Sequence, residues 1–348
     1  KNQQAEDESL GQLYADFLWV INPRRYEWFL SDTYTQTLIS PLSLDTPDNR
    51  RNSNAVSTGP NFIWRIDSRN DVVLEARADR VIFESNNSAA VADNSRLNIT
   101  SIWDYRLRSS SSLALNYFIE TVKYDDLNYS DNYNRNDLYL SFEHHRGTNF
   151  FEADLGVVNI NYADTEDISE TRFRLSAQDA RTRTSSLRFE LSRNVTDISS
   201  ELINRIEVRD LNIEPEANVS DIYIDKSARV IFNKALTSGV LDFTAYTRIN
   251  DYRQQDQLDQ TEKGYQIEVI FEVQRASSLG ISASYSSSVF DLMSREDDDY
   301  LYSISYIYNA RRHFSLNYEI IFQERVSNDP ANDYEDTRYL LTLNYSTQ

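Results

Sequence analysis

The sequence has no cysteine, and its 348 residues include only 3 histidines, 7 glycines and 1 methionine. The absence of cysteine excludes disulfide frameworks, thiolate metal ligands and cysteine nucleophiles. Walker loops, dinucleotide fingerprints, His-Glu-x-x-His and Gly-x-Ser-x-Gly motifs are absent as well. We therefore expect a protein that is not an enzyme and that holds neither a metal nor a cofactor.

Long apolar runs and positive charge are also scarce. Mean hydropathy is −0.60, and no apolar run approaches the roughly 20 residues of a spanning helix. With 35 basic and 55 acidic residues the net charge is −20, which argues against a nucleic-acid partner because phosphate binding needs a basic face. The 23 Tyr, 16 Phe and 4 Trp argue against disorder. A polar, tyrosine-rich β protein is the class that remains.

The dominant pattern is alternation of apolar and polar residues with period two. Residues 265–273 place Tyr, Ile, Val, Phe and Val at every second position, with mostly polar residues between them. The ranges 95–107, 241–249 and 314–322 follow the same pattern. Successive side chains of a strand lie on opposite faces, so each segment has one apolar and one polar face.

The strands come in pairs joined by alternating short and long connections. Short links include Asp67–Asn70 and Gln274–Ser277, and long links include Asp125–Arg135, Asp291–Asp298 and Val326–Asp333. This arrangement is typical of an antiparallel, up-and-down transmembrane β-barrel with short periplasmic turns and long extracellular loops. We predict about sixteen strands, near residues 26–38, 55–66, 71–84, 95–107, 112–124, 136–146, 149–162, 170–180, 185–195, 221–233, 239–251, 263–273, 278–289, 299–308, 312–325 and 334–345.

Two segments leave the count open. Residues 196–220 hold a possible strand at Leu202–Arg209, which we place in a long external loop. Residues 10–21 fit either a helical stripe capped by Ser9 or a strand over Leu13–Ile21. Accepting both strands gives about eighteen. We therefore expect residues 1–25 to be a periplasmic segment, a plug or a first hairpin strand, residues 26–348 to be the barrel, and both termini to lie on the periplasmic side.

The polar faces carry repeated charges and the apolar faces end in aromatic residues, which favours a membrane barrel over a soluble sandwich. In a barrel the polar face lines the lumen. The candidate solute or polymer contacts are Glu75, Arg77, Asp79, Arg96, Asp104, Arg106, Glu120, Arg172, Arg174, Arg188, Glu190, Tyr223, Asp225, Arg229, Tyr246, Arg248, Glu268, Glu272 and Arg338. The candidate aromatic girdle residues are Trp28, Trp64, Trp103, Tyr105, Tyr300, Tyr302, Tyr339 and Tyr345.

The segment from Ile21 to Pro60 carries a family resemblance. It contains INPRRYEW with Pro23 and Trp28, then Thr46, Pro47 and Asn49, and then Ser57–Pro60 entering the next strand. This run resembles the outer-membrane β-barrel family of exopolysaccharide loci, which includes PEP-CTERM-associated proteins of β-barrel porin type. The resemblance implies a role in polysaccharide export or assembly.

Other polar clusters receive plainer interpretations. His144 and His145 beside Glu143 suit polar surface or rim residues better than a catalytic or metal site. EF-hand spacing is absent from the acidic runs Asp125–Asp126, Asp164–Asp167 and Glu296–Asp299. Solvated loops are therefore a simpler interpretation of these runs than calcium sites.

Our leading hypothesis is a passive, hydrated outer-membrane route for an exopolysaccharide in a Gram-negative bacterium. A general diffusion porin for small polar solutes and a structural or adhesin-like barrel acting through its loops are the alternatives. The implied partners are outer-membrane lipid and lipopolysaccharide, the polysaccharide, and periplasmic export or co-polymerase proteins, with no nucleic acid. No charged n-region with a following apolar stretch opens the sequence, so we expect the mature form of an exported protein.

Overall fold

The computed structural model describes residues 13–39, 42, 49–84, 93–126, 131–162, 165–208, 221–311 and 314–345. These residues form one antiparallel sheet of 17 strands. The strands are β1 Leu13–Asn22, β2 Tyr26–Leu38, β3 Arg50–Arg65, β4 Asn70–Phe83, β5 Asn94–Arg108, β6 Ser111–Tyr124, β7 Tyr133–Arg146, β8 Asn149–Tyr162, β9 Ile168–Thr182, β10 Ser185–Thr196, β11 Tyr223–Leu236, β12 Gly239–Tyr252, β13 Gln260–Gln274, β14 Ser277–Phe290, β15 Arg295–Arg311, β16 Phe314–Ser327 and β17 Tyr334–Tyr345.

Each strand pairs with the strands that precede and follow it in the chain, from β1–β2 through β16–β17. The predicted all-β, up-and-down architecture is confirmed, and all sixteen predicted strands are present. The seventeenth is β1, which pairs with β2 through contacts such as Trp19 opposite Trp28. Residues 13–22 are therefore a strand rather than a helical stripe.

The odd number of strands changes the expected placement of the ends. β1 begins at the end of the sheet that carries the long links, whereas β17 finishes at the end that carries the short turns. The expectation that both ends lie on one side is therefore wrong for the described strands, because β1 and β17 run in the same direction. No pairing of β1 with β17 is found among the described residues, so closure of the sheet is not detected.

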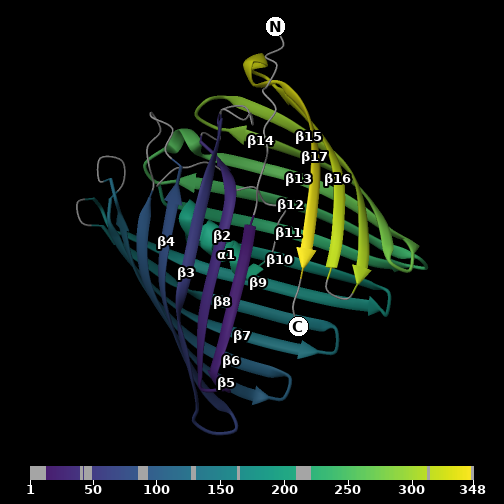
Figure 1. The fold of residues 1–348 in the computed structure, drawn as a ribbon. Helices are drawn as coiled ribbons and strands as arrows, with labels where there is room; N and C mark the ends of the chain where they lie inside the picture. Colours follow the sequence, from purple (N-terminus) through teal and green to yellow (C-terminus); the bar gives the residue numbers. More distant parts are fainter. Residues whose placement is uncertain are drawn as a thin grey trace.

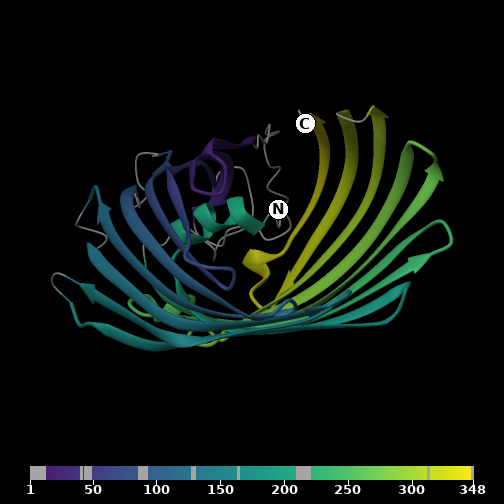
Figure 2. The ribbon, with the colours of Figure 1, turned by 90° about the horizontal axis from the view of Figure 1, so that it is seen from below.

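The sheet curves into a deep trough, and helix α1 (Ile198–Val208) lies on its concave side (Figures 1 and 2). The possible strand at Leu202–Arg209 is wrong, because the residues from Leu202 to Val208 belong to the helix. Residue 209 lies outside the described part. Ile198 and Leu202 are four residues apart and both are buried, as one face of a helix requires. Two short 3₁₀ helices, η2 Asp256–Leu258 and η3 Pro330–Asn332, lie in later links. In the described ranges no helix combines the length and apolarity needed to cross a membrane.

Two other boundaries differ from the sequence expectation. Glu296–Asp299 belong to β15 rather than to a link over 291–298, because Arg295 and Arg325 pair with the carboxylates of Asp297 and Asp299. Ser57–Pro60 lie in the middle of β3 rather than at its entry, since β3 begins at Arg50. Residues 43–48, which include Thr46 and Pro47, lie outside the described residues.

The two faces of the sheet differ in chemistry. The convex face carries large apolar side chains that are exposed, such as Leu155 at 69% and Leu341 at 65%. The concave face carries the charged side chains that alternate with them, among them Asp154 and Arg338. Removing apolar side chains from water is favourable. A convex face that exposes so many large apolar side chains is therefore suited to an apolar surrounding rather than to water.

Candidate functional site

The candidate site is the concave face together with α1. The cross-strand registers place all nineteen predicted lumen residues on this face, in the same rows as the residues that contact α1. The predicted girdle residues from Trp28 to Tyr339 lie in the alternate, convex rows, and Trp64 and Tyr339 are 49% and 67% exposed. Tyr345 ends β17, but its side chain lies outside the described part of the chain.

A buried cluster around Arg96 of β5 joins the sheet to the start of α1. The Arg96 guanidinium donates from Nη2 to Asp197 Oδ1 at 2.7 Å and from Nη1 to Ser200 Oγ at 2.7 Å. It also contacts Glu120 Oε1 at 3.3 Å, and its Nε donates to Asn94. The side chains of Arg96, Glu120 and Asp197 are 0%, 5% and 2% exposed. Two acids and one base are thus held together away from water.

Asp197 has two roles in this cluster. Its Oδ1 accepts from the backbone N–H of Ser200 at 2.9 Å, so it caps the N-terminus of α1. It also accepts from the Tyr133 hydroxyl. Burial by itself raises the pKa of Asp197, but the Arg96 charge and these hydrogen bonds outweigh burial and leave the pKa below its ordinary value of 3.8. The carboxylate is therefore ionised at neutral pH.

A second cluster holds the other side of the first helical turn. Glu201 Oε1 accepts from Arg248 Nη2 of β12 at 2.9 Å and from the Tyr223 hydroxyl of β11. Arg248 also contacts Asp225 at 3.2 Å. Helix α1 is therefore bonded to β5 and β7 through Asp197 and to β11 and β12 through Glu201.

Between these clusters α1 covers an apolar patch on the concave face. Ile198 and Leu202 pack in one buried cluster with inward residues of β4, β6 and β8. These inward residues lie near the long-link end of their strands and include Val81, Phe83, Val122, Val158 and Ile160. Sequence reasoning missed this patch because it treated every inward row as a wall in contact with water.

Farther along the wall, the charges are mostly paired with one another. Arg172 contacts Asp137 at 3.2 Å and stacks over the Tyr139 ring at 4.0 Å. Arg188 contacts Glu190 at 2.7 Å. Pairs also form between Arg77 and Glu75, Arg174 and Asp154, Arg229 and Glu190, and Arg338 and Asp336. Glu268 and Glu272 have no ion pair among the described residues. Paired charges leave a polar wall with a weak net field.

The short-turn end of the concave face is more open. Asp71 is contacted by Arg65 at 3.1 Å and by Arg106, whose side chain is 40% exposed. Asp104 lies in the same row as Asp71. Such exposed pairs contribute little stability but keep this end of the face hydrated.

The histidines form local pairs. His145 lies 3.9 Å from Glu143 and 3.8 Å from Glu152, and is 52% exposed. His144 Nδ1 lies 2.8 Å from the Ser111 hydroxyl on the convex face. A serine nucleophile also needs a group that orients the histidine, and within the described ranges no acid or amide does so for His144. Nor do the described residues contain three or more His, Cys, Asp or Glu grouped to hold a metal ion.

Three carboxylates of the acidic runs pair with arginines. Asp125 accepts a two-point contact from Arg80, and this hydrogen bond, as the largest cause, lowers the pKa of the Asp125 carboxyl. Asp297 and Asp299 pair with Arg295 and Arg325. Asp164 lies outside the described residues. At Asp125, Asp297 and Asp299, arginine occupies the positions that a calcium ion would need.

Part of the chain matches a family of known proteins. Residues 233–347, from the end of β11 to β17, match the family described as "Putative beta-barrel porin 2". This agrees with the β-barrel porin type of the resemblance, although the match lies outside Ile21–Pro60. No curated protein matches.

Solved outer-membrane proteins are similar in structure to this chain. A variant of the ferric enterobactin receptor PfeA of Pseudomonas aeruginosa has a TM-score of 0.56 at 9% identity, covering 94% of this chain and 60% of the receptor. The chain thus spans somewhat under two thirds of the receptor's length. A loop-deletion variant of OmpT, an outer membrane protein of Vibrio cholerae, has a TM-score of 0.45 at 7% identity, covering 95% of this chain and 99% of OmpT.

Proposed function

We propose that this protein is a non-enzymatic, porin-like channel of a Gram-negative outer membrane, with the charged concave face lining a hydrated lumen. The observation that carries the proposal is the separation of the two faces. Large apolar residues such as Leu155 and Leu343 are exposed on the convex face, while arginines and carboxylates alternate with them on the concave face. In a membrane barrel the apolar face contacts lipid and the polar face contacts water.

Helix α1 narrows this lumen at the long-link end. It lies within the trough (Figure 2) and is bonded to strands on two sides of it, through Asp197 and Glu201. Barrels of sixteen to eighteen strands are wider than their side chains can fill, so an inserted helix determines the free cross-section. The charged clusters therefore act as attachments of a constriction.

In its finer form the proposal assigns an exopolysaccharide chain as the cargo. The resemblance at Ile21–Pro60 supports this, as does a wall in which paired charges alternate with tyrosines such as Tyr139 and Tyr246. Aromatic faces stack on sugar rings, and charged groups hydrogen-bond hydroxyls. Transport is passive, with energy supplied by partners in the periplasm and inner membrane. A general porin for small polar solutes is the alternative, and the match to a porin family favours it.

Planar bilayers test the channel itself. The purified protein is expected to conduct ions in steps, and Arg96→Met, which detaches α1, is expected to raise the unit conductance. Lys234→Gln, which removes a charge from the convex face at the short-turn end, is the control and should leave it unchanged. Absence of conductance in all three proteins would contradict the proposal.

A deletion strain tests the cargo. Loss of the gene is expected to trap polymer in the periplasm, and the native gene is expected to restore export. Normal export with reduced uptake of small sugars would instead assign the protein as a general porin.

A further inference from the structure

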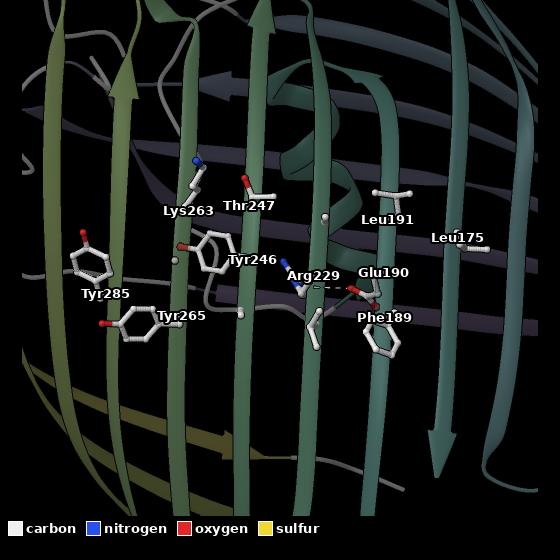
Figure 3. A pocket seen from close by; sticks show the side chains of 14 residues that line it. Leu175, Phe189, Glu190, Leu191, Arg229, Tyr246, Thr247, Lys263, Tyr265 and Tyr285 are labelled. Carbon is white, nitrogen blue, oxygen red and sulfur yellow. Dashed lines mark ion pairs between the residues drawn. The ribbon is translucent and has the colours of Figure 1, made fainter. Parts of the chain in front are cut away.

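A hollow lies on the convex face of strands β9–β14, on the opposite side of the sheet from α1 (Figure 3). Its volume is about 650 Å³, within the roughly 300–1,000 Å³ of small-molecule sites. Aromatic and aliphatic residues form its sides, with Phe189 49% exposed and Tyr265 52% exposed. Leu175, Leu191 and Tyr285 complete the rim.

The hollow exists because small residues interrupt two rows of large ones. One row runs Phe189, Val230, Ala245, Tyr265 across β10–β13, and the row nearer the long links runs Leu191, Ala228, Thr247, Lys263. Ala228 and Ala245 form the floor between bulky side chains. Gly264 lies between Lys263 and Tyr265, and on the concave side the Tyr246 ring occupies the position of its missing side chain. The floor is therefore thin but closed.

Lys263 gives the edge of the hollow nearer the long links a positive charge. In the next row toward the long links, Arg193 pairs with Glu170 at 2.6 Å and Lys226 pairs with Asp251. Lys263 is exposed and makes no ion pair among the described residues. Figure 3 shows it on the long-link side of the hollow, with Phe189 and Tyr265 on the other side. An unpaired ammonium beside an apolar hollow matches a ligand with an anionic head and an apolar chain.

The level of the hollow fits a membrane interface. Tyr265, Tyr285 and Tyr300 lie in one row across β13–β15, with ring centroids 5.3 and 5.2 Å apart. The Tyr285 hydroxyl donates to Asp298 at 2.8 Å. Tyrosines with an apolar body and a bonded hydroxyl are typical of the boundary between headgroups and acyl chains. The long-link end is the outer-leaflet side of a barrel.

We propose that this hollow is a binding site for one molecule of an anionic outer-leaflet glycolipid of the lipid A type. One acyl chain lies over Ala228 and Ala245, and a phosphate contacts Lys263. The inference rests on the proposed function only in placing the convex face in the outer membrane. It concerns a lipid held at a fixed site and is independent of what the lumen transports.

Native mass spectrometry of the detergent-purified protein, titrated with bis-phosphorylated lipid A, tests the site. The native protein is expected to retain one lipid A that is lost last as collision energy rises. Ala245→Phe fills the hollow and Lys263→Gln removes the charge, and each is expected to weaken retention about tenfold, as loss of one good contact does. With dephosphorylated lipid A, the native protein and Lys263→Gln should bind equally.

Two matched variants serve as controls. Ala283→Phe enlarges another outward alanine, on β14, and Lys234→Gln removes an outward lysine at the short-turn end. Both should retain lipid A like the native protein. Equal retention by all five proteins, or a change of oligomeric state in Ala245→Phe without loss of lipid, would overturn the site. Planar-bilayer conductance of the same variants should be unchanged, so failure of the channel proposal is recognised separately.

Discussion

The two ends of the concave face are built from the same alternating strands but are filled differently. At the long-link end Val81, Val122 and Val158 are fully buried beneath α1, and the charges of Arg96 and Asp197 are buried with them. At the short-turn end Asp71 and Arg106 form a pair whose side chains are 18% and 40% exposed. The comparison shows that alternation places a side chain on a face, but an added element decides whether that face contacts water.

The largest expected difference between the two ends comes from removing one arginine at each. Arg96→Met leaves Asp197 and Glu120 buried without their base, which we expect to cost about 3–5 kcal/mol of α1 docking. Arg106→Met breaks an exposed pair and should cost about 1 kcal/mol or less. Hydrogen exchange of the amides of residues 200–203 measures the docking. Similar protection in both variants would remove the distinction between the ends.

The apolar part of the buried end is tested by shortening one helix residue. Leu202 is 1% exposed, and Leu202→Ala should destabilise α1 docking by about 2–5 kcal/mol because a cavity remains. Ile203, which is only partly buried against the same cluster, is the control, and Ile203→Ala should cost less. The same exchange experiment ranks the two variants. If Ile203→Ala is the more damaging, the helix faces the sheet in a different orientation.

A smaller effect is expected from a single hydroxyl. Tyr223→Phe removes the donor to Glu201 while leaving the Arg248 contact at 2.9 Å in place. Loss of one hydrogen bond to a charged group costs about 1.5–3 kcal/mol. Tyr265→Phe on the exposed convex face should leave α1 protection unchanged. A double-mutant cycle with Arg248→Gln would show coupling if the two donors share Glu201, and additivity would exclude that arrangement.

The smallest expected effect is that of a pH change within the physiological range on conductance. The folded pKa of Asp197 lies below its ordinary value of 3.8, so its contribution to α1 docking is complete above that value and is lost as pH falls through the folded pKa. Conductance is therefore expected to stay constant between about pH 5 and 8 and to rise only under stronger acid. Asp197→Asn should abolish that acid rise. A transition near neutral pH would show that another group controls docking.

The strands were predictable because their signal is local. Period-two alternation identified every strand from β2 to β17, and the bounds of β2 and β17 agree to the residue. The seventeenth strand was recognised only as an alternative, because Leu13–Ile21 also fits a helical stripe. The side of the sheet on which each charge lies follows from the same period.

Helix α1 could not be predicted in the same way. Its docking depends on Arg96, which is 101 residues away from Asp197 in the chain. One local signal was available, namely Asp197 three residues before Ser200 as an N-cap, followed by Ile198 and Leu202 at helical spacing. The alternation of apolar and polar residues over Ile206, Glu207, Val208 and Arg209 competed with that signal. The apolar inward patch that α1 covers was equally hard to predict from the sequence. Val81 lies on the same face of its strand as the charged Asp79, and Val122 lies on the same face of its strand as the charged Glu120.

The proposed function requires the convex face to contact lipid and the concave face to contact water, and the cysteine-free sequence allows a direct measurement. Single cysteines at Gln266, Ile267 and Glu268 of β13, spin-labelled in proteoliposomes, report oxygen from lipid and a nickel chelate from water. We expect oxygen access at Ile267→Cys and nickel access at the two flanking positions. Nickel access at Ile267→Cys with oxygen access at its neighbours, or no alternation at all, would contradict the proposed function.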